Sequence, residues 1–459
     1  MPPALDANAL RTGSSHDASA VRPDLAVDFE ACQVALGDPA SLDLLDACLR
    51  LSREPLVEED VDLVGPRNRR QEVEPIHTIP CKLTHYGREN VGVVPVRRTT
   101  RRREHAEDEA AELRDQHLVR VVHREVRGAY SVVATVPDVG LVCFRDPYGI
   151  KPIIFGEKET DEGKWFACAS ESVVLDVNEY TRSFDVGPGE AVLVDENREI
   201  HRRRITERDH RPCIFELVYF SRPDSFLDDI SVYKTRKRFG EALAQQWADE
   251  GAPTPDVVMP IPDSSRDAAL AMALGMNLPY REGLVKNRYI GRTFIMPNQK
   301  SRSNSVRRKM NPIGIEFEGK KVLLVDDSIV RGTTSKRIVQ MVRDAGATEV
   351  YLASTSPPLL APCPYGVDMA TKTEFVATGR ETEEIAEELG ADHLVYLDLE
   401  RMNQCGKAGN EKIDAFCNAC FNGEYPTGDI TAERLRSIAG DRCLNRGEAV
   451  TDESAPASV

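Results

Sequence analysis

The sequence lacks any long hydrophobic run: no apolar stretch approaches the roughly 20 residues that span a membrane. It also lacks a charged segment followed by an apolar one at the N-terminus, so we expect no secretory signal. A basic excess is missing as well, since the formal net charge is −16, which argues against general affinity for nucleic acid. We therefore expect a cytoplasmic protein with no membrane segment, whose 459 residues suffice for two or three domains.

The segment from Lys321 to Ser335 is the most informative part of the chain. It begins with a short apolar run, residues 322–325, that predicts a strand, and Asp326 and Asp327 follow where the strand would leave its sheet. A glycine-containing loop with several hydroxyl groups then leads into a helix, whose apolar stripe has three- and four-residue spacing. The expected loop residues are Ser328, Arg331, Gly332, Thr333, Thr334 and Ser335, and the expected stripe is Ile338, Met341, Val342 and Ala345.

This order of residue types suits a sugar phosphate. A glycine lets backbone N–H groups approach an anion closely, and the free amides of the next helix attract it further. The two carboxylates would repel a phosphate, so they suit ribose hydroxyls or a divalent cation instead. The alternative is a chance acidic turn before an ordinary helix, which the complete ordered run makes the weaker interpretation.

The segment LLVDDSIVRGTTS resembles the phosphoribosyl pyrophosphate (PRPP) motif of type I phosphoribosyltransferases, most closely the form in glutamine PRPP amidotransferases. The resemblance extends from about Arg127 to about Thr427. It implies mixed α/β and α+β architecture, with a partial N-terminal-nucleophile (Ntn) glutaminase sandwich before a type I phosphoribosyltransferase domain with a parallel sheet. The expected regions are an atypical, unassigned segment (1–118), a partial glutamine amidotransferase domain of the Ntn type (119–206), the phosphoribosyltransferase domain (207–400) and a C-terminal segment with a CxxC (401–459).

Residues 119–206 show short apolar runs divided by turns, which is typical of a layered sheet domain. Proline and glycine mark one turn at residues 145–149. The expected strands cover residues 128–133, 140–144, 152–156, 166–172 and 186–190.

In the next domain, residues 256–262 predict a second strand that ends at Asp263 and Ser264, before a helix from Arg266 to Leu274. The resemblance makes this corner the diphosphate loop and makes Ser264, Asp326 and Asp327 the contacts for Mg2+. A serine that merely caps the helix is the alternative, and both roles can coexist. The basic segment 286–309 resembles the family's flexible loop, which closes over PRPP. The implied PRPP-binding residues are Asp263, Ser264, Lys286, Arg292, Asp326, Asp327, Ser328, Arg331, Gly332, Thr333, Thr334 and Ser335.

Eleven cysteines in a cytoplasmic chain indicate metal ligands or free thiols more than a disulfide framework. A CxxC alone is a weak signal. The resemblance adds that Cys213, Cys363, Cys417 and Cys420 occupy the positions that hold a structural 4Fe-4S cluster in iron–sulfur members of the family. Zn2+ is the alternative, since four thiolates serve it equally well.

The resemblance fails over residues 1–118. The family begins, after removal of Met, with a nucleophilic cysteine, whereas Pro2 follows Met1 here, and Cys32, Cys48 and Cys81 are internal. A divergent segment and a gene model with a wrong start or frame are the two explanations. We identify no glutaminase nucleophile and therefore expect free ammonia, rather than glutamine, to serve this chain.

The resemblance implies an amidophosphoribosyltransferase, which forms 5-phosphoribosylamine from PRPP and ammonia in the first step of purine biosynthesis. Two alternatives stay open: a catalytically inactive PRPP-binding regulator on the same fold, and a type I phosphoribosyltransferase with a base as acceptor. The flexible loop and the diphosphate corner argue against the first, while the sheet domain and the four cysteines argue against the second. Purine nucleotides as feedback inhibitors and a homo-oligomeric state are further expectations from the family.

Overall fold

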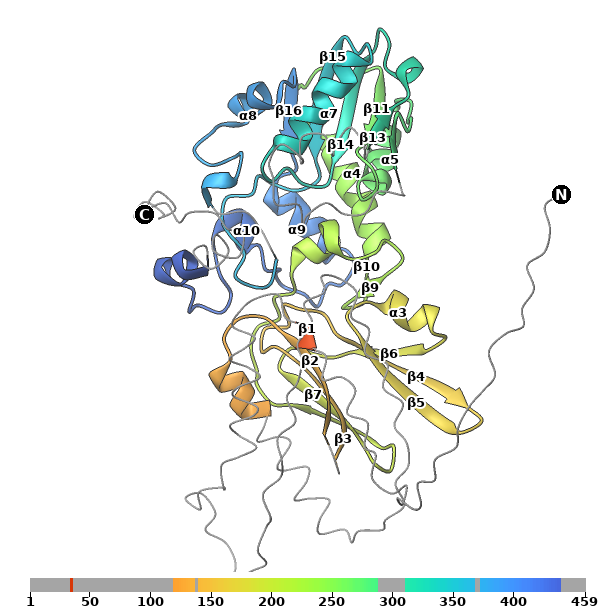
Figure 1. Ribbon diagram of the computed structural model, residues 1–459, viewed down its shortest axis with the longest axis vertical. Helices are drawn as coiled ribbons and strands as arrows, with labels where there is room; N and C mark the ends of the chain where they lie inside the picture. Colours follow the sequence, from red (N-terminus) through yellow and green to blue (C-terminus); the bar gives the residue numbers. More distant parts are fainter. Residues whose placement is uncertain (1–33, 36–118, 137–138, 288–309, 368–371, 439–459) are drawn as a thin grey trace, which may run out of the picture. The chain divides into compact units, whose positions relative to one another are not determined.

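The computed structural model describes residues 34–35, 119–136, 139–287, 310–367 and 372–438, and Figure 1 shows how their helices and strands are arranged. These residues belong to one compact unit, Gln33–Val459. Apart from residues 34–35, the segment 1–118 lies outside the described residues, as do residues 288–309. Within the described part of the chain, no helix combines the length and the apolar character needed to cross a membrane.

The first described region contains two antiparallel sheets, a 5-stranded one in the order β1-β2-β3-β7-β8 and a 3-stranded one in the order β5-β4-β6. A helix over residues 119–125 precedes the first sheet's second strand. The elements are β1 (Val34–Ala35), β2 (Ser131–Val136), β3 (Gly140–Arg145), β4 (Ile154–Thr160), β5 (Gly163–Ala169), α3 (Ser172–Val177), β6 (Thr181–Asp185), β7 (Glu190–Asp195) and β8 (Ile200–Arg204).

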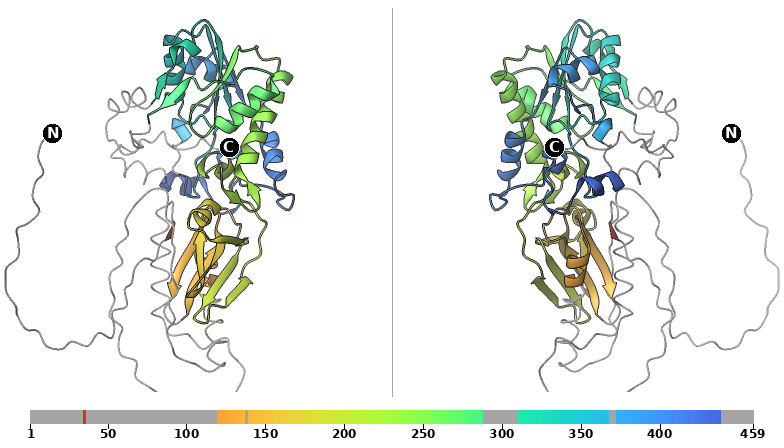
Figure 2. Two further views of the ribbon diagram at one scale, coloured as in Figure 1. Left: turned by 90° about the vertical axis from the view of Figure 1, so that its right-hand side faces the viewer. Right: turned by 90° about the vertical axis from the view of Figure 1, so that its left-hand side faces the viewer.

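The two sheets stack face to face. Successive side chains of each strand point to opposite faces, so one face of β3 packs against the other sheet and the opposite face packs elsewhere. Leu141 of β3 packs with Phe155 and Phe166 of the other sheet. Its neighbours Val142 and Phe144 lie on the opposite face, in a cluster that includes residues of the helix at 119–125. Figure 2 shows the layered sheets from two sides. The layered sheet domain expected from the sequence is therefore present, and the finer Ntn assignment stays a prediction.

Two local predictions in this region were wrong. Residues 186–189 form a turn rather than a strand, since Glu190 donates its N–H to the carbonyl of Gly187 (3.1 Å) and β7 begins only at Glu190. Pro188 has no N–H to offer a ladder, and Gly189 has a φ of 63°. The strand predicted over 166–172 ends at Ala169, and Ser172 already begins α3.

The second region contains a 4-stranded, fully parallel sheet in the order β11-β14-β15-β16. This confirms the parallel sheet of the phosphoribosyltransferase domain. The elements are η1, a π-helix (Glu216–Phe220), β9 (Phe226–Leu227), β10 (Ile230–Ser231), α4 (Val232–Asp249), β11 (Val257–Pro260), α5 (Arg266–Gly275), β12 (Leu284–Lys286), β13 (Met310–Pro312), η2 (Gly314–Glu316), β14 (Lys321–Asp326), α7 (Thr333–Asp344), β15 (Glu349–Ser354), η3 (Lys372–Glu374), α8 (Thr382–Leu389), β16 (His393–Tyr396), α9 (Leu399–Lys407) and α10 (Ala419–Asn422).

Helices cover both faces of the parallel sheet, as Figures 1 and 2 show. Leu323 of β14 lies in a cluster with residues of α4 and α5, while its neighbour Leu324 lies in another with residues of α7 and α8. Strands buried on both faces read as unbroken apolar runs, which is what residues 322–325 show. The boundary predicted between 400 and 401 falls inside α9, which packs against α4.

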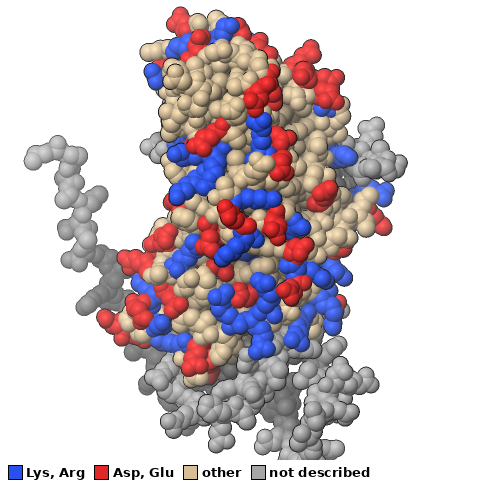
Figure 3. Space-filling view, turned by 180° about the vertical axis from the view of Figure 1, so that it is seen from behind, with Lys and Arg blue, Asp and Glu red and all other residues tan. Residues whose placement is uncertain are grey.

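Charges of both signs are interspersed on the face drawn in Figure 3, and basic side chains gather toward the lower part of that view. The strand β8 contributes three consecutive arginines, residues 202–204, to the antiparallel region. Arg202 donates to Glu190 (2.9 Å) and lies over the ring of Phe184, 3.7 Å from its centroid. At least this arginine is therefore engaged within the fold.

Candidate functional site

The acidic corner lies where β14 leaves the parallel sheet. Asp326 is the last residue of the strand and Asp327 the first beyond it. Thr355, at the end of the neighbouring strand β15, donates its N–H to the carbonyl of Asp326 (3.0 Å) and its hydroxyl to the carbonyl of Asp327 (3.3 Å). The two carboxylates therefore sit at the carboxyl edge of the sheet, where open parallel sheets bind ligands.

A second corner, at the end of β11, meets the first. The hydroxyl of Ser264 donates to Oδ2 of Asp327, and Ser328 donates to Oδ1 of the same carboxylate (2.7 Å). The N-cap of α5 is Ser265, not Ser264. The alternative role of Ser264 as a helix cap is therefore wrong, and its side chain instead joins the two corners.

The electrostatics of the corner favour a bound cation. Burial, followed by the adjacent charge of Asp327, raises the pKa of Asp326 well above its usual value. Burial also raises the pKa of Asp327, against hydrogen bonds from Ser264 and Ser328 and the charge of Arg236. Two buried carboxylates of like charge destabilise each other unless a cation lies between them. Their oxygens and the Ser264 hydroxyl fit Mg2+, which prefers hard oxygen ligands.

The glycine-containing loop between β14 and α7 is shorter than the sequence predicted. Gly332, with a φ of 70°, is the N-cap of α7, and the helix begins at Thr333, so Thr333, Thr334 and Ser335 form its first turn rather than the loop. Thr333 and Thr334 are exposed, whereas Ser335 is buried. The first amides of this helix have no partner within it, so they and the two exposed hydroxyls can donate to an anion. The apolar stripe is confirmed, since Ile338, Met341 and Val342 are buried.

Basic side chains near both corners are held by acidic partners. Lys286, at the end of β12, lies 2.7 Å from Oδ2 of Asp263, and Arg266 lies 3.5 Å from Oδ1. Arg331 pairs with Glu374 (2.9 Å). Asp263 is thereby compensated and does not simply repel an anion. Arg292, together with most of the basic segment expected to form the flexible loop, lies outside the described residues.

Sequence reasoning missed Arg236, which lies within α4 and is only 3% exposed. It donates from Nε to the carbonyl of Leu217 (3.0 Å) and from a terminal nitrogen to that of Ser221 (2.7 Å), at the two ends of η1. Its charge also opposes the rise that burial causes in the pKa of Asp327. A charged residue on the buried stripe of an amphipathic helix was the available signal.

The four predicted cysteine ligands converge. Cys213 and Cys417 form an isolated parallel bridge, and the carbonyl of Cys420 accepts the N–H groups of residues 360 and 361, just before Cys363. Burial raises the pKa of Cys213 to about 12 and that of Cys420 well above its usual value, and in Cys420 the other three thiols add to the effect. Thiols that influence one another in a buried place can hold a metal centre once they are deprotonated.

The spacing of these thiols bears on which centre they fit. No three of the four sulfur atoms, all of them in described residues, lie within 4.8 Å of one another. In a closed tetrahedral zinc site with Zn–S bonds of about 2.3 Å, geometry puts the sulfurs roughly 3.8 Å apart. The described thiols are therefore spaced more widely than those of a closed zinc site. Asp195, Glu199 and His201 do lie that close, but Asp195 already binds His201 (3.0 Å) and the backbone of Glu199 (2.8 Å) within the β7–β8 turn.

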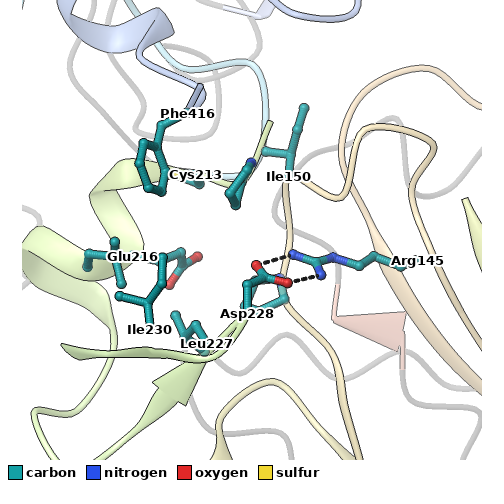
Figure 4. Close-up of a pocket in the computed structure, with 11 residues that line it drawn as sticks. Arg145, Ile150, Cys213, Glu216, Leu227, Asp228, Ile230 and Phe416 are labelled. Atoms are coloured by element: carbon teal, nitrogen blue, oxygen red, sulfur yellow. Dashed lines mark hydrogen bonds and ion pairs between the residues drawn. The ribbon is translucent and has the colours of Figure 1, made fainter. Parts of the chain in front are cut away.

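A buried ion pair joins the two regions next to this cysteine site. Arg145, at the end of β3, is 1% exposed and donates to both carboxylate oxygens of Asp228 (2.6 and 2.9 Å). Figure 4 shows the pair at the edge of a cavity whose lining includes Ile150, Cys213 and Glu216. The sequence predicted a turn at residues 145–149, and nothing in it indicated this contact.

The parallel sheet and the two corners that meet at its carboxyl edge define a type I phosphoribosyltransferase. The family model described as "Phosphoribosyl transferase domain" matches residues 232–356. Beyond this class, the chain belongs to the amidophosphoribosyltransferase family, pentosyl-transferring enzymes of purine biosynthesis.

The relatives support this membership over both regions. The amidophosphoribosyltransferase of Pseudomonas aeruginosa is 50% identical over 338 residues, covering 72% of this chain and 68% of the relative. That of Saccharomyces cerevisiae is 46% identical, covering 68% and 62%. A solved structure of glutamine PRPP amidotransferase from B. subtilis, complexed with ADP and GMP, is similar with a TM-score of 0.61 and 38% identity, covering 70% of this chain and 69% of that one. The chain thus spans about two thirds of the length of the relatives that it matches.

Proposed function

We propose that this chain transfers the 5-phosphoribosyl group of PRPP to ammonia, forming 5-phosphoribosylamine and diphosphate. The nitrogen of ammonia forms a bond to C1 of the ribose, the bond from C1 to the diphosphate oxygen breaks, and a proton passes to solvent. The observation that carries the proposal is the hydrogen bond from Ser264 to Asp327. It joins the end of β11 to the end of β14, so that a sugar and a diphosphate can be held at one point.

Each part of the site has a role in this proposal. The amides at the start of α7, with Thr333 and Thr334, bind the 5-phosphate at the positive end of the helix. Asp326 and Asp327 orient the ribose hydroxyls and, with Ser264, would hold Mg2+. When bound, Mg2+ would neutralise the charge that develops on the leaving diphosphate. Lys286 pairs with Asp263 at the diphosphate corner, and its ammonium can leave this carboxylate to bind the diphosphate of PRPP.

The test measures diphosphate release from PRPP with ammonium chloride, with and without EDTA, using the complete chain. Release that depends on both ammonia and a divalent cation is the expected result. PRPP binding without any turnover would favour the inactive regulator instead. Turnover with a purine or pyrimidine base, but not with ammonia, would favour a different type I phosphoribosyltransferase.

We also propose that residues 119–206 are part of an Ntn-type glutaminase domain. The stacked antiparallel sheets, flanked by the helix at 119–125 and by α3, support this assignment. Whether glutamine can supply the ammonia depends on residues outside those described, so the expectation of free ammonia stays a prediction. Parallel assays with glutamine and with ammonium chloride at high pH test it directly, and turnover supported by glutamine would contradict it.

We further propose that Cys213, Cys363, Cys417 and Cys420 hold a structural 4Fe-4S cluster. Four converging thiols, spaced more widely than a closed zinc site, support it. Protein purified without oxygen should be brown and contain iron and acid-labile sulfide in equal amounts. Zinc without sulfide would replace the cluster by a zinc site, and the absence of both would leave ordinary thiols.

Regulation by purine nucleotides follows the same family relation. The related B. subtilis structure is described as complexed with ADP and GMP. We propose that purine nucleotides inhibit this chain and that it forms homo-oligomers. Inhibition by GMP and ADP in the ammonia assay, together with the mass in solution from light scattering, tests both statements.

A further inference from the structure

A turn from the antiparallel region reaches the cysteine site. The carboxylate of Asp146 accepts the N–H groups of Ile150 (3.1 Å) and Lys151 (3.0 Å), which holds this turn in shape. Cys213 then donates its own N–H to the carbonyl of Ile150 (3.1 Å). These backbone hydrogen bonds therefore place residue 151 next to Cys213.

The side chain of Lys151 is paired there with Glu216. Its Nζ lies 3.1 Å from Oε1 of Glu216, and the two side chains are 21% and 14% exposed. Glu216 begins η1 and donates its N–H to the carbonyl of Cys213 (3.3 Å). A cation from one region and an anion from the other thus flank the first of the four cysteines.

The ion pair with Glu216 also keeps Lys151 charged although most of its side chain is buried. Burial alone would lower the pKa of Lys151, but Glu216 and then the sulfurs of Cys213 and Cys363 raise it above its usual value. The ammonium therefore stays charged beside Glu216, whose N–H is bound to the carbonyl of the first of the four cysteines. Its Nζ also lies 5.9 Å from the centroid of the Phe220 ring, so part of its surroundings is apolar and screens charge poorly.

We propose that Lys151 and Glu216 are positioning residues of the cysteine centre, which act on it with opposite sign. The inference rests on the proposed cluster. A centre with four thiolates is negatively charged, and taking up one electron makes it more so. A nearby cation favours that reduction and a nearby anion opposes it, because outer charges tune a metal centre through space. Through Lys151, the antiparallel region would set the reduction potential of a cluster whose ligands it does not supply.

The test compares Lys151→Met, Lys151→Arg and Glu216→Gln in the complete chain, purified anaerobically. Each is first assayed for iron and sulfide, then titrated with dithionite while electron paramagnetic resonance follows the reduced cluster. Lys151→Met should lower the reduction potential and Glu216→Gln should raise it. We expect a change of roughly tenfold in the reduction equilibrium for each, about 59 mV for a one-electron step. Lys151→Arg should stay close to the unchanged chain.

The opposite directions of the two shifts in reduction potential distinguish this role from that of an ion pair that only joins the two regions. If the ion pair mattered only for folding, both variants would be less stable, and the reduction potential would shift in neither variant or in the same direction in both. Either result would overturn the inference. Lys158→Met, which removes the Lys158–Glu179 pair (2.8 Å) of the same region, is the matched control and should not shift the potential. If Lys151→Met loses its iron, Glu216→Gln decides the matter by the sign of its shift.

Failure of the underlying proposal looks different. An unchanged chain that contains no iron and no sulfide would remove the cluster itself, and this inference with it. A cluster that is present in the unchanged chain but indifferent to both substitutions would remove the role of Lys151 and Glu216 alone.

Discussion

The acidic corner at the end of β14 differs from the junction that Arg145 and Asp228 form between the two regions. Both join residues far apart in the chain: Ser264 and Asp327 are 63 residues apart, and Arg145 and Asp228 are 83 apart. The first contact could be expected because the same pattern, an apolar strand followed by polar residues, occurs twice, and parallel strands end at one edge. The second joins the last residue of β3 to the turn between β9 and β10, and no repeated pattern marks these two positions. Sequence separation therefore does not decide what can be predicted, whereas regular periodicity does.

The junction should be broken most severely by removing one partner of its ion pair. Arg145→Met or Asp228→Asn should lower the free energy of unfolding by about 3–5 kcal/mol, because the remaining charge stays buried without its partner. Arg145 also donates to three backbone carbonyls, those of residues 149, 151 and 186, so Arg145→Met should destabilise the fold more than Asp228→Asn. Urea unfolding measures the loss.

The control for this prediction is the exposed pair Lys158–Glu179 of the same region. Lys158→Met should change stability by less than about 1 kcal/mol. If Arg145→Met were equally mild, the junction would not be stabilised by its buried pair.

The corner should respond in chemistry rather than in stability. Asp326→Asn or Asp327→Asn should lower kcat/KM for PRPP by about 10²–10³-fold, since each removes charge that binds the cation and the ribose. Titration calorimetry should show weaker binding of PRPP in the presence of Mg2+. Asp344→Asn, at the far end of α7, is the control and should leave both unchanged. Normal affinity in both corner variants would exclude these carboxylates from the site.

The antiparallel region should be the more sensitive of the two to acid. Burial lowers the pKa of His123 to about 4, against a hydrogen bond with the backbone of Arg145, and burial also lowers that of His210 to about 4. The unfolded chain, with a histidine pKa near 6.5, binds more protons between these values, so stability falls as the pH drops from about 6.5 toward 4. The loss should approach about 3 kcal/mol per histidine.

The two tryptophans allow this to be measured region by region. Trp165 lies in β5 and Trp247 in α4, so Trp247→Phe leaves a fluorescence probe of the antiparallel region. Urea midpoints from pH 8 to pH 5 should fall less steeply once His123→Gln is added. Equal slopes with and without His123 would show that its neutral form does not stabilise the fold.

The smallest expected loss of stability comes from a substitution at Gly332, in the glycine-containing loop before α7. A Cβ at Gly332 would lie 2.7 Å from Cδ2 of Leu389, in addition to its φ of 70°. Gly332→Ala should cost about 1–3 kcal/mol and raise the KM for PRPP, because the start of α7 must move. Gly379 has a φ of 66° and open space at its Cβ, so Gly379→Ala should show the backbone cost alone. Equal effects would mean that contact with α8 does not fix the loop.

Much of the fold around the corner was predictable. The strand predicted at residues 322–325 lies within β14, and the helix predicted from Arg266 to Leu274 ends one residue later, because buried parallel strands and helices have clear sequence patterns. The start of α7 was placed too late, since Thr and Ser are common in both loops and first helical turns. Residues 186–189 were included with the strands although Gly187, Pro188 and Gly189 are typical turn residues.

By itself, the sequence indicated the strands of the parallel sheet and the acidic corner, since each depends on a local order of residue types, whereas the set of four cysteines came from the resemblance to a family. Tertiary structure alone decided that Ser264 binds Asp327 rather than capping α5, that Arg236 binds the carbonyls of Leu217 and Ser221, and that Lys151 reaches the cysteine site. The physical reason is that a buried polar group takes whichever partner the packed fold brings to it, and a linear pattern does not specify that partner.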